Sequence, residues 1–183
     1  MKAKTLRSIA GGLIFLTVVL AAGAARAEFG LIFVTIEGTR QGKFKGESLR
    51  PNAADRIEAL GVTYEVLGPH DLATGQASGK RQHKPLSITK EWGAATPQLF
   101  QALVTNEVLK TVVIEFIGVA RDGRPEVAHS IRLTNATVSH MREFTEKEQA
   151  GLRPLEEVSF TFQRIEITNN RGRTTAMDDW AVR

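Results

Sequence analysis

The sequence predicts an all-β protein, a compact two-sheet β-barrel or sandwich with one flanking short α-helix. Three observations support this fold class. Apolar and polar side chains alternate over many short segments, a period of two that is typical of strands. One stretch changes to the spacing of a helix. The last predicted strand moves its apolar side chains from one face to the other, as strands that bend between sheets do.

The expected strands follow one another at short intervals from residue 31 onward. Thr111–Val119 is apolar on both faces, which predicts a central strand. After it, Arg121–Pro125 contains Asp-Gly, a pair that supplies the positive φ angles of a tight hairpin turn. The predicted strands are Leu31–Glu37, Leu60–Val66, Leu86–Trp92, Thr111–Val119, a strand from Val127 that reaches toward Phe144, and Val158–Ile167.

A single short helix is predicted after Trp92. Thr96 can cap its N-terminus, with Pro97 in the first position, where a missing N–H costs nothing. Leu99 and Leu103 then form an i/i+4 apolar stripe with their neighbours. We expect the helix to end near Asn106.

The last strand changes phase in its middle. Phe160 and Phe162 occupy even positions, whereas Ile165 and Ile167 occupy odd ones. Because a one-residue slip sends side chains to the opposite face, we predict a β-bulge or bend near Gln163-Arg164.

Residues 1–27 have the three parts of a cleavable secretory signal peptide. Three of the first seven residues are Lys or Arg, an apolar run follows from Ile9 to Ala25, and Ala25-Arg26-Ala27 precedes Glu28 as a small-x-small cleavage site. The apolar run is short and rich in Ala and Gly, which argues against an anchor of about 20 residues. The expected domains are a signal peptide at 1–27 and one β-domain at 28–183.

The net charge of +4 comes from this leader. Residues 1–27 hold four Lys and Arg and no Asp or Glu, so the mature chain keeps 20 bases against 20 acids. A neutral domain gives no support for nucleic-acid binding, which needs a basic surface. It also does not oppose self-association. With no cysteine, the chain has neither disulfides nor thiolate chemistry.

No catalytic, metal-binding or cofactor-binding constellation is visible in the sequence. None of the four histidines has metal-ligand spacing. Gly75–Lys80 resembles a phosphate-binding loop, but it is one residue short, continues with Arg81 and precedes a strand instead of a helix. Glu156-Glu157 indicates a solvated strand start, since adjacent strand residues point to opposite faces. We therefore expect no enzyme and no cofactor.

Two segments lack a regular pattern, Gly38–Arg56 and Gly68–Gln82. Both are rich in Gly, Pro, Lys and Arg. Long loops in a compact domain are either mobile or functional. Mobile surface loops and partner contacts both remain open for them.

The segment Gly79–Trp92, GKRQHKPLSITKEW, resembles the central signature of the Hcp family, the hemolysin-coregulated proteins. Ala95–Leu103 is similar to the family's Ser/Thr-Pro helix start. Leu133–Val138 and Leu155–Phe162 resemble its downstream blocks. The resemblance runs from about Leu31 to Trp180, nearly all of the mature chain.

This resemblance implies a bacterial tube protein of type VI secretion, a β-barrel with one helix. Its members form six-membered rings that stack into a tube, which carries a spike protein at its tip and small effectors in its lumen. The partners expected here are therefore other copies of this chain, a spike protein and small effectors. The candidate subunit or ring contacts are Lys80, Arg81, Gln82, His83, Lys84, Pro85, Lys43, Lys45 and Arg50.

The leader departs from this pattern, because tube subunits normally carry none. It predicts a secreted or periplasmic protein that meets a membrane only transiently, through the signal peptide. Three hypotheses follow: a tube subunit or close paralogue, an exported Hcp-like binding module that acts outside the tube, and a secreted enzyme on the same barrel. The last has no visible site to support it.

Overall fold

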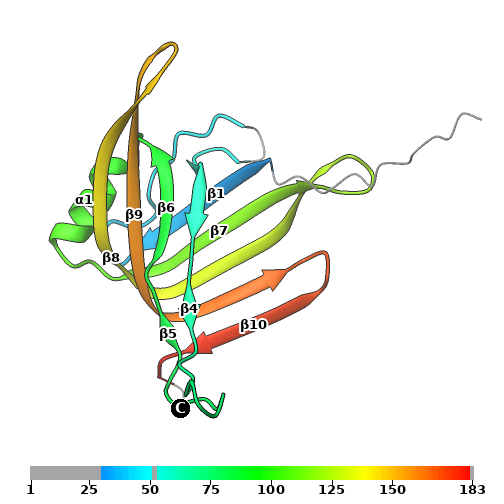
Figure 1. The fold of residues 1–183 in the computed structure, drawn as a ribbon. Coiled ribbons are helices and arrows are strands. Elements are labelled where there is room, and N and C mark those ends of the chain that lie inside the picture. Colours follow the sequence, from blue (N-terminus) through cyan, green and yellow to red (C-terminus); the bar gives the residue numbers. More distant parts are fainter. Residues whose placement is uncertain (1–29, 51–52, 182–183) are drawn as a thin grey trace, which may run out of the picture.

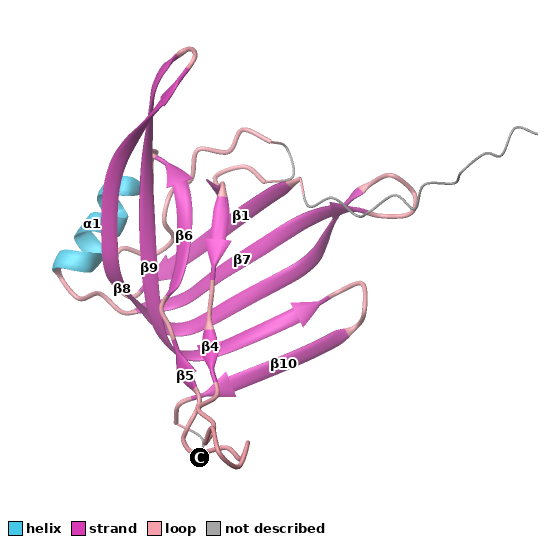
Figure 2. Ribbon diagram, in the orientation of Figure 1, coloured by secondary structure: helices cyan, strands magenta, loops and turns pink. Residues whose placement is uncertain are grey.

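The computed structural model describes residues 30–50 and 53–181, so the predicted leader lies outside the described residues. Within the described residues the chain is mostly strand with one short helix (Figure 2). None of the helical structure in this part is long and apolar enough to cross a bilayer. The elements are β1 (Leu31–Gly38), β2 (Ile57–Ala59), β3 (Gly61–Thr63), β4 (Val66–Leu67), β5 (Gln82–His83), β6 (Leu86–Glu91), α1 (Thr96–Val104), β7 (Leu109–Val119), β8 (Pro125–Glu148), β9 (Gly151–Asn169) and β10 (Thr174–Asp179).

The strands form one large antiparallel sheet and one small one. The large sheet has the order β2-β1-β7-β8-β9-β6-β3, and β10 also pairs with β9. Two strands share the edge of β9 that faces away from β8. Strand β6 pairs with its first part, Leu155–Phe160, and β10 pairs with its last part, Arg164–Asn169. Strands β4 and β5 form the small sheet. The predicted fold class is confirmed, although the large sheet curls without closing (Figure 1).

The large sheet bends at Asn135 on β8 and Gln163 on β9. On β8 the buried side chains pass from Leu133 to Ala136, a change of face. On β9 they pass from Phe160 to Ile165, again a change of face. Figure 1 shows β8 and β9 curving together from one part of the large sheet into the other. The bend lets one long hairpin contribute to both halves of the core.

Of the two alternatives predicted near Gln163-Arg164, a β-bulge or a bend, the structure has the bend. Pairing stays in register from Thr134↔Arg164 to Ala136↔Phe162, and the register shifts only between Val138 and His140. Asn135 has a φ of 48° and donates through Nδ2 to the Gln163 side chain at 2.8 Å. A left-handed residue on β8 thus replaces the expected extra residue on β9.

Two other strand predictions need correction. Leu60–Val66 is divided between β3 and β4, because the chain leaves β6 after Thr63 and pairs with β5 from Val66. In the hairpin turn only Gly123 has a positive φ, of 81°. Asp122 instead accepts a hydrogen bond from the Arg124 N–H at 3.1 Å. The central position of β7, between β1 and β8, is confirmed.

Helix α1 lies on the flank of the sheet, as predicted. Its first residue and its buried apolar face differ from the prediction. Thr96 is the first helical residue and Ala95 is the N-cap. The Thr96 hydroxyl accepts a hydrogen bond from the Gly93 N–H at 3.0 Å. Leu99 and Ala102 are fully buried, whereas Phe100 is 55% exposed. The buried face of α1 is therefore narrower than the sequence suggested.

Candidate functional site

Strand β5 divides the predicted contact segment Lys80–Pro85 between two faces. Arg81 and His83 are partly buried, while Lys80, Gln82 and Lys84 are exposed. This is the alternation that an extended chain imposes. The inward pair holds the end of β10, and the outward residues leave their side chains available to a partner.

The inward pair binds Asp178 on β10. Arg81 donates to both carboxylate oxygens, through Nη2 at 2.6 Å and through Nε, and also to the Asp179 carbonyl at 3.1 Å. His83 Nε2 lies 2.7 Å from Asp178 Oδ2, and His83 Nδ1 contacts the Tyr64 hydroxyl. We call Tyr64, Arg81, His83 and Asp178 the β10 latch.

The electrostatics of the latch stabilise an ionised aspartate. Hydrogen bonds from Arg81, joined by that from His83, hold the pKa of Asp178 below its usual range and outweigh partial burial. Burial, followed by the nearby Asp178 charge, raises the pKa of Tyr64. An Asp-His-Tyr chain resembles a catalytic relay, but a nucleophile needs a lowered pKa or a free base. The geometry therefore suits anchoring of β10 better than catalysis.

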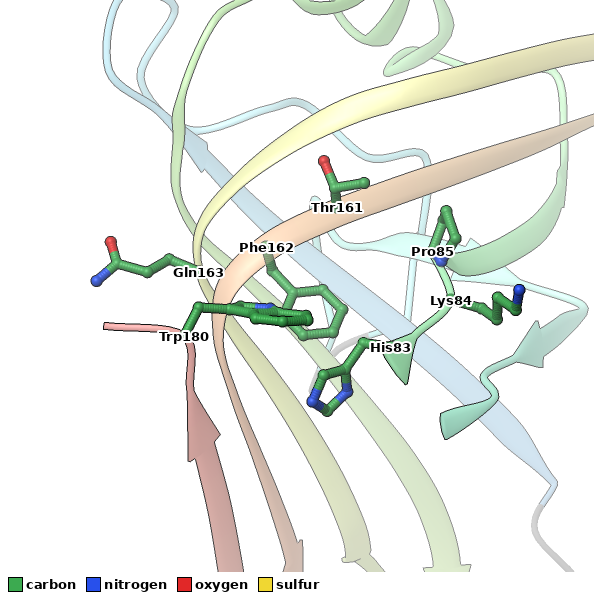
Figure 3. A pocket seen from close by; sticks show the side chains of 7 residues that line it. All are labelled: His83, Lys84, Pro85, Thr161, Phe162, Gln163 and Trp180. Atoms are coloured by element: carbon green, nitrogen blue, oxygen red, sulfur yellow. The ribbon is translucent and has the colours of Figure 1, made fainter. Parts of the chain in front are cut away.

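Aromatic side chains pack beside the latch and line a shallow pocket of about 450 Å³ (Figure 3). His83 meets Trp180 edge-on with ring centroids 5.2 Å apart, and Phe162 at 5.6 Å. The Arg81 guanidinium lies 5.7 Å from the Trp180 ring centroid, a cation–π distance. Lys84 and Pro85 form the opposite wall of the pocket. Trp180 thus fixes the end of the described chain against β5.

The other predicted contact residues lie far from the latch in sequence, on the segment after β1. The side chains of Lys43 and Lys45 are exposed. The Lys45 N–H donates to the Gln98 side chain at 2.8 Å, which ties this segment to α1. Arg50 lies 3.3 Å from Glu58 in an exposed ion pair. The structure does not bring these three residues together with Lys80–Pro85 into one site.

A buried ion pair was missed by the sequence interpretation. Lys90 Nζ lies 2.7 Å from Glu156 Oε1, and both side chains have no exposed surface. Thr96 also donates to Glu156 Oε1, at 3.0 Å. The expectation that Glu156 is solvated is wrong, because the pairing Lys90↔Glu156 places both on the core face. Lys90 follows Leu86 and Ile88 at period two, a signal that could have revealed it.

In the described part of the chain, no group of three or more His, Cys, Asp or Glu side chains is arranged to hold a metal ion. The features that remain are the β10 latch, its aromatic pocket and the outward face of β5.

Comparison with known proteins agrees with this geometry. A family model described as "Type VI secretion system effector, Hcp" matches residues 33–168. The "Major exported protein" of Pseudomonas aeruginosa is 30% identical over 161 residues, which cover 81% of this chain and 94% of that protein.

Solved structures show the same fold. The crystal structure of an Hcp protein superposes with a TM-score of 0.76 at 28% identity, covering 82% of this chain and 99% of the other. The secreted protein Hcp3 from Pseudomonas aeruginosa gives a TM-score of 0.68 at 26% identity, covering 82% and 97%. The chain therefore belongs to the Hcp family of type VI secretion tube and effector proteins.

Proposed function

We propose that this chain is a non-enzymatic structural subunit of type VI secretion that assembles as hexameric rings, and that the rings stack into a tube. A spike protein at the tube end and small effectors in the lumen are the further partners. The observation that carries the proposal is the family match over residues 33–168, which spans β1 to β9 and so nearly the whole sheet.

The open edge of β10 supports contacts within a ring. This strand pairs with β9 on one side and, among the described residues, with no strand on the other. Its first four residues, Thr174–Met177, carry no charge and no proline. Monomeric proteins usually block such an edge with Lys or Pro. An unblocked edge on a protein of neutral mature charge favours pairing with a second copy.

Exposed leucines at two opposite ends support contacts between rings. The β8–β9 hairpin projects from one end of the sheet, and the loop between β4 and β5 projects from the other (Figure 1). Leu152 near the hairpin tip is 72% exposed, and Leu72 in the loop is fully exposed. In a stack of identical rings, these two ends would face each other.

The outward face of β5 is the third proposed contact. Lys80, Gln82 and Lys84 make no side-chain hydrogen bond or ion pair with any described residue. Lys43 and Lys45 are proposed on the same grounds, whereas Arg50 already pairs with Glu58. Arg81 and His83 position β10 and act on assembly only through it.

The test is the mass of mature protein 28–183 by native mass spectrometry and light scattering. We expect a particle of about six subunits, and a strict monomer from micromolar to millimolar concentration would contradict the proposal. Leu72→Asp should shorten stacks in electron micrographs while rings persist. The control is Val104→Asp, on the 55% exposed outer face of α1, which should change neither.

A pair of β5 variants separates contact from anchoring. Lys84→Ala should weaken assembly and leave the melting temperature of the barrel unchanged. Arg81→Ala should lower the melting temperature, because it leaves Asp178 without its guanidinium partner. Equal effects of the two variants on both measurements would refute the division of β5 into two faces.

We also propose that residues 1–27 are a cleaved signal peptide and that the protein is secreted or periplasmic. The support is the sequence pattern of the leader. An alkaline-phosphatase fusion at residue 40 should be active when the leader is present and inactive without it. Mass spectrometry of the exported protein should find Glu28 at the N-terminus, and a retained leader would disprove cleavage.

A further inference from the structure

The segment between β1 and β2 places the side chain of Glu47 at the turn that leads into α1. A Cβ added at Gly93 would lie 2.5 Å from Glu47 Oε2 and 2.9 Å from Oε1. The carboxylate therefore faces a position where any side chain would displace it. Glu47 also accepts a hydrogen bond from the Ala94 N–H. One acidic residue of the segment is thus docked against the start of the helix.

Two charged side chains from the core lie close enough to act on Glu47. They are Lys90 from β6 and Glu156 from β9, and they are the only charges among the described residues that act on it. From α1 the neighbouring polar group is the neutral hydroxyl of Thr96, which bonds to Glu156. We call Glu47, Lys90 and Glu156 the α1 cluster.

The α1 cluster has one negative charge and one buried acceptor in excess. Lys90 balances Glu156, with Nζ 2.7 Å from Oε1, and no second cation balances Glu47. Glu156 Oε1 also accepts from Thr96, whereas Glu156 Oε2 is buried without a hydrogen-bond partner among the described residues. A buried acceptor that lacks a donor lowers stability. A proton is the ligand that would correct such an excess.

Glu47 is the member of the cluster that can exchange protons with solvent. It is exposed, whereas the side chains of Lys90 and Glu156 have no exposed surface. Burial of part of Glu47, to which the charge of Glu156 adds, raises the pKa of Glu47 above 4.5 and outweighs the opposing charge of Lys90. The stability contributed by a raised carboxyl pKa is fully present below about pH 4.5 and is lost as the pH rises through the folded value.

We propose that the α1 cluster is a proton-binding site, and that a proton taken up through Glu47 holds the segment Lys43–Arg50 more firmly against α1. The hydrogen bond from the Lys45 N–H to the Gln98 side chain, at 2.8 Å, lies beside this site and should be strengthened with it. The effect on ring contacts through Lys43 and Lys45 rests on the proposed function, whereas proton binding itself does not.

The test is amide hydrogen exchange of mature protein 28–183 at pH 7 and pH 5, corrected for intrinsic exchange rates. The reporters are the Lys45 N–H and the Ser48 N–H, which donates to the Arg56 carbonyl at 3.1 Å. We expect their protection to rise by roughly threefold to tenfold at pH 5, because one pKa unit corresponds to a tenfold change. In Glu47→Gln, which carries no charge, protection should be the same at both pH values.

Gly93→Ala is a second variant, because its Cβ would displace the Glu47 carboxylate. It should also abolish the pH dependence, with the low protection of pH 7 at both values. The control is Glu65→Gln, an exposed carboxylate between β3 and β4, which should keep the wild-type dependence.

The same pH dependence in wild type and Glu47→Gln would overturn the proposal. So would a Glu47 carboxyl that titrates at or below pH 4.5 in carbon-13 NMR spectra. Exchange is measured at low protein concentration, so the result does not depend on assembly. A chain that never forms rings would refute the proposed function and leave the proton site standing.

Discussion

The two segments without a regular sequence pattern have opposite structures. Gly38–Arg56 packs onto the sheet, with Phe44 only 2% exposed and Ser48 5% exposed. Nearly every residue of Gly68–Gln82 is exposed. The second segment is held mainly by hydrogen bonds within itself, and Asp71 alone accepts from the Ala73 and Thr74 N–H groups and the Thr74 hydroxyl.

A single buried carboxylate explains much of this difference. Glu107 accepts hydrogen bonds from the Arg40 N–H at 2.6 Å, the Gln41 N–H at 2.9 Å and the Gln41 side chain at 2.9 Å. The Phe44 N–H adds a bond to the Ile36 carbonyl at 3.0 Å. A segment without periodicity can therefore be part of the core when a distant residue satisfies its backbone.

The largest expected effect is that of Phe44→Ala, which removes a buried ring from the packed segment. We expect a loss of about 3–4 kcal/mol in the free energy of unfolding, measured by urea denaturation. Leu72→Ala in the exposed segment is the matched control. A loss below about 1 kcal/mol in Phe44→Ala would show that Gly38–Arg56 is not part of the core.

Glu107→Gln should have an intermediate effect that depends on pH. Burial alone would raise the pKa of Glu107, but the N–H donors of Gln41 and Arg40 outweigh it and lower the pKa below 4.5. A lowered pKa contributes stability that is present above pH 4.5 and is lost as pH falls through the folded value.

At pH 7 we therefore expect Glu107→Gln to destabilise the protein by roughly 2 kcal/mol. The difference from wild type should narrow as the pH falls below about 4, in parallel urea titrations. A difference that stays constant from pH 7 to pH 3 would mean that the charge of Glu107 is unimportant.

The smallest expected effect is that of Asp71→Ala in the exposed segment. The melting temperature should not change, because the bonds it removes lie within the loop. Limited proteolysis should cut between residues 68 and 81 faster than in wild type, since the backbone bonds that shape the loop are lost. A lower melting temperature would show that this loop also supports the barrel.

The strands and the single helix were predictable because their period is local. The Lys90–Glu156 pair was not, since it depends on register between β6 and β9, strands separated by more than 60 residues. The alternation along β6 places Lys90 on the core face. A buried Lys charge is tolerable only because Glu156 neutralises it, and the local pattern does not reveal that partner. The local pattern predicted Thr96 as a helix cap. Its hydroxyl instead donates a hydrogen bond to Glu156 of the buried pair.

The candidate site was predicted in outline only. The alternation of Arg81 and His83 with Lys80, Gln82 and Lys84 is present in the sequence as a period of two. Which face turns inward depends on Asp178, about 95 residues away on β10. The role of the outward residues in assembly stays a prediction.

The order of the strands also sets the order in which the protein can fold. Strands β7, β8, β9 and β10 form consecutive hairpins, so they can form from nearby chain. Strand β1 must wait for β7, and β6 must wait for β9. Contacts between such distant segments are slow to form and leave apolar strands open meanwhile. A chain that emerges N-terminus first can cover one edge of β1 with β2, but the other edge stays unpaired until β7 arrives, and a holding chaperone would be of most use in that interval.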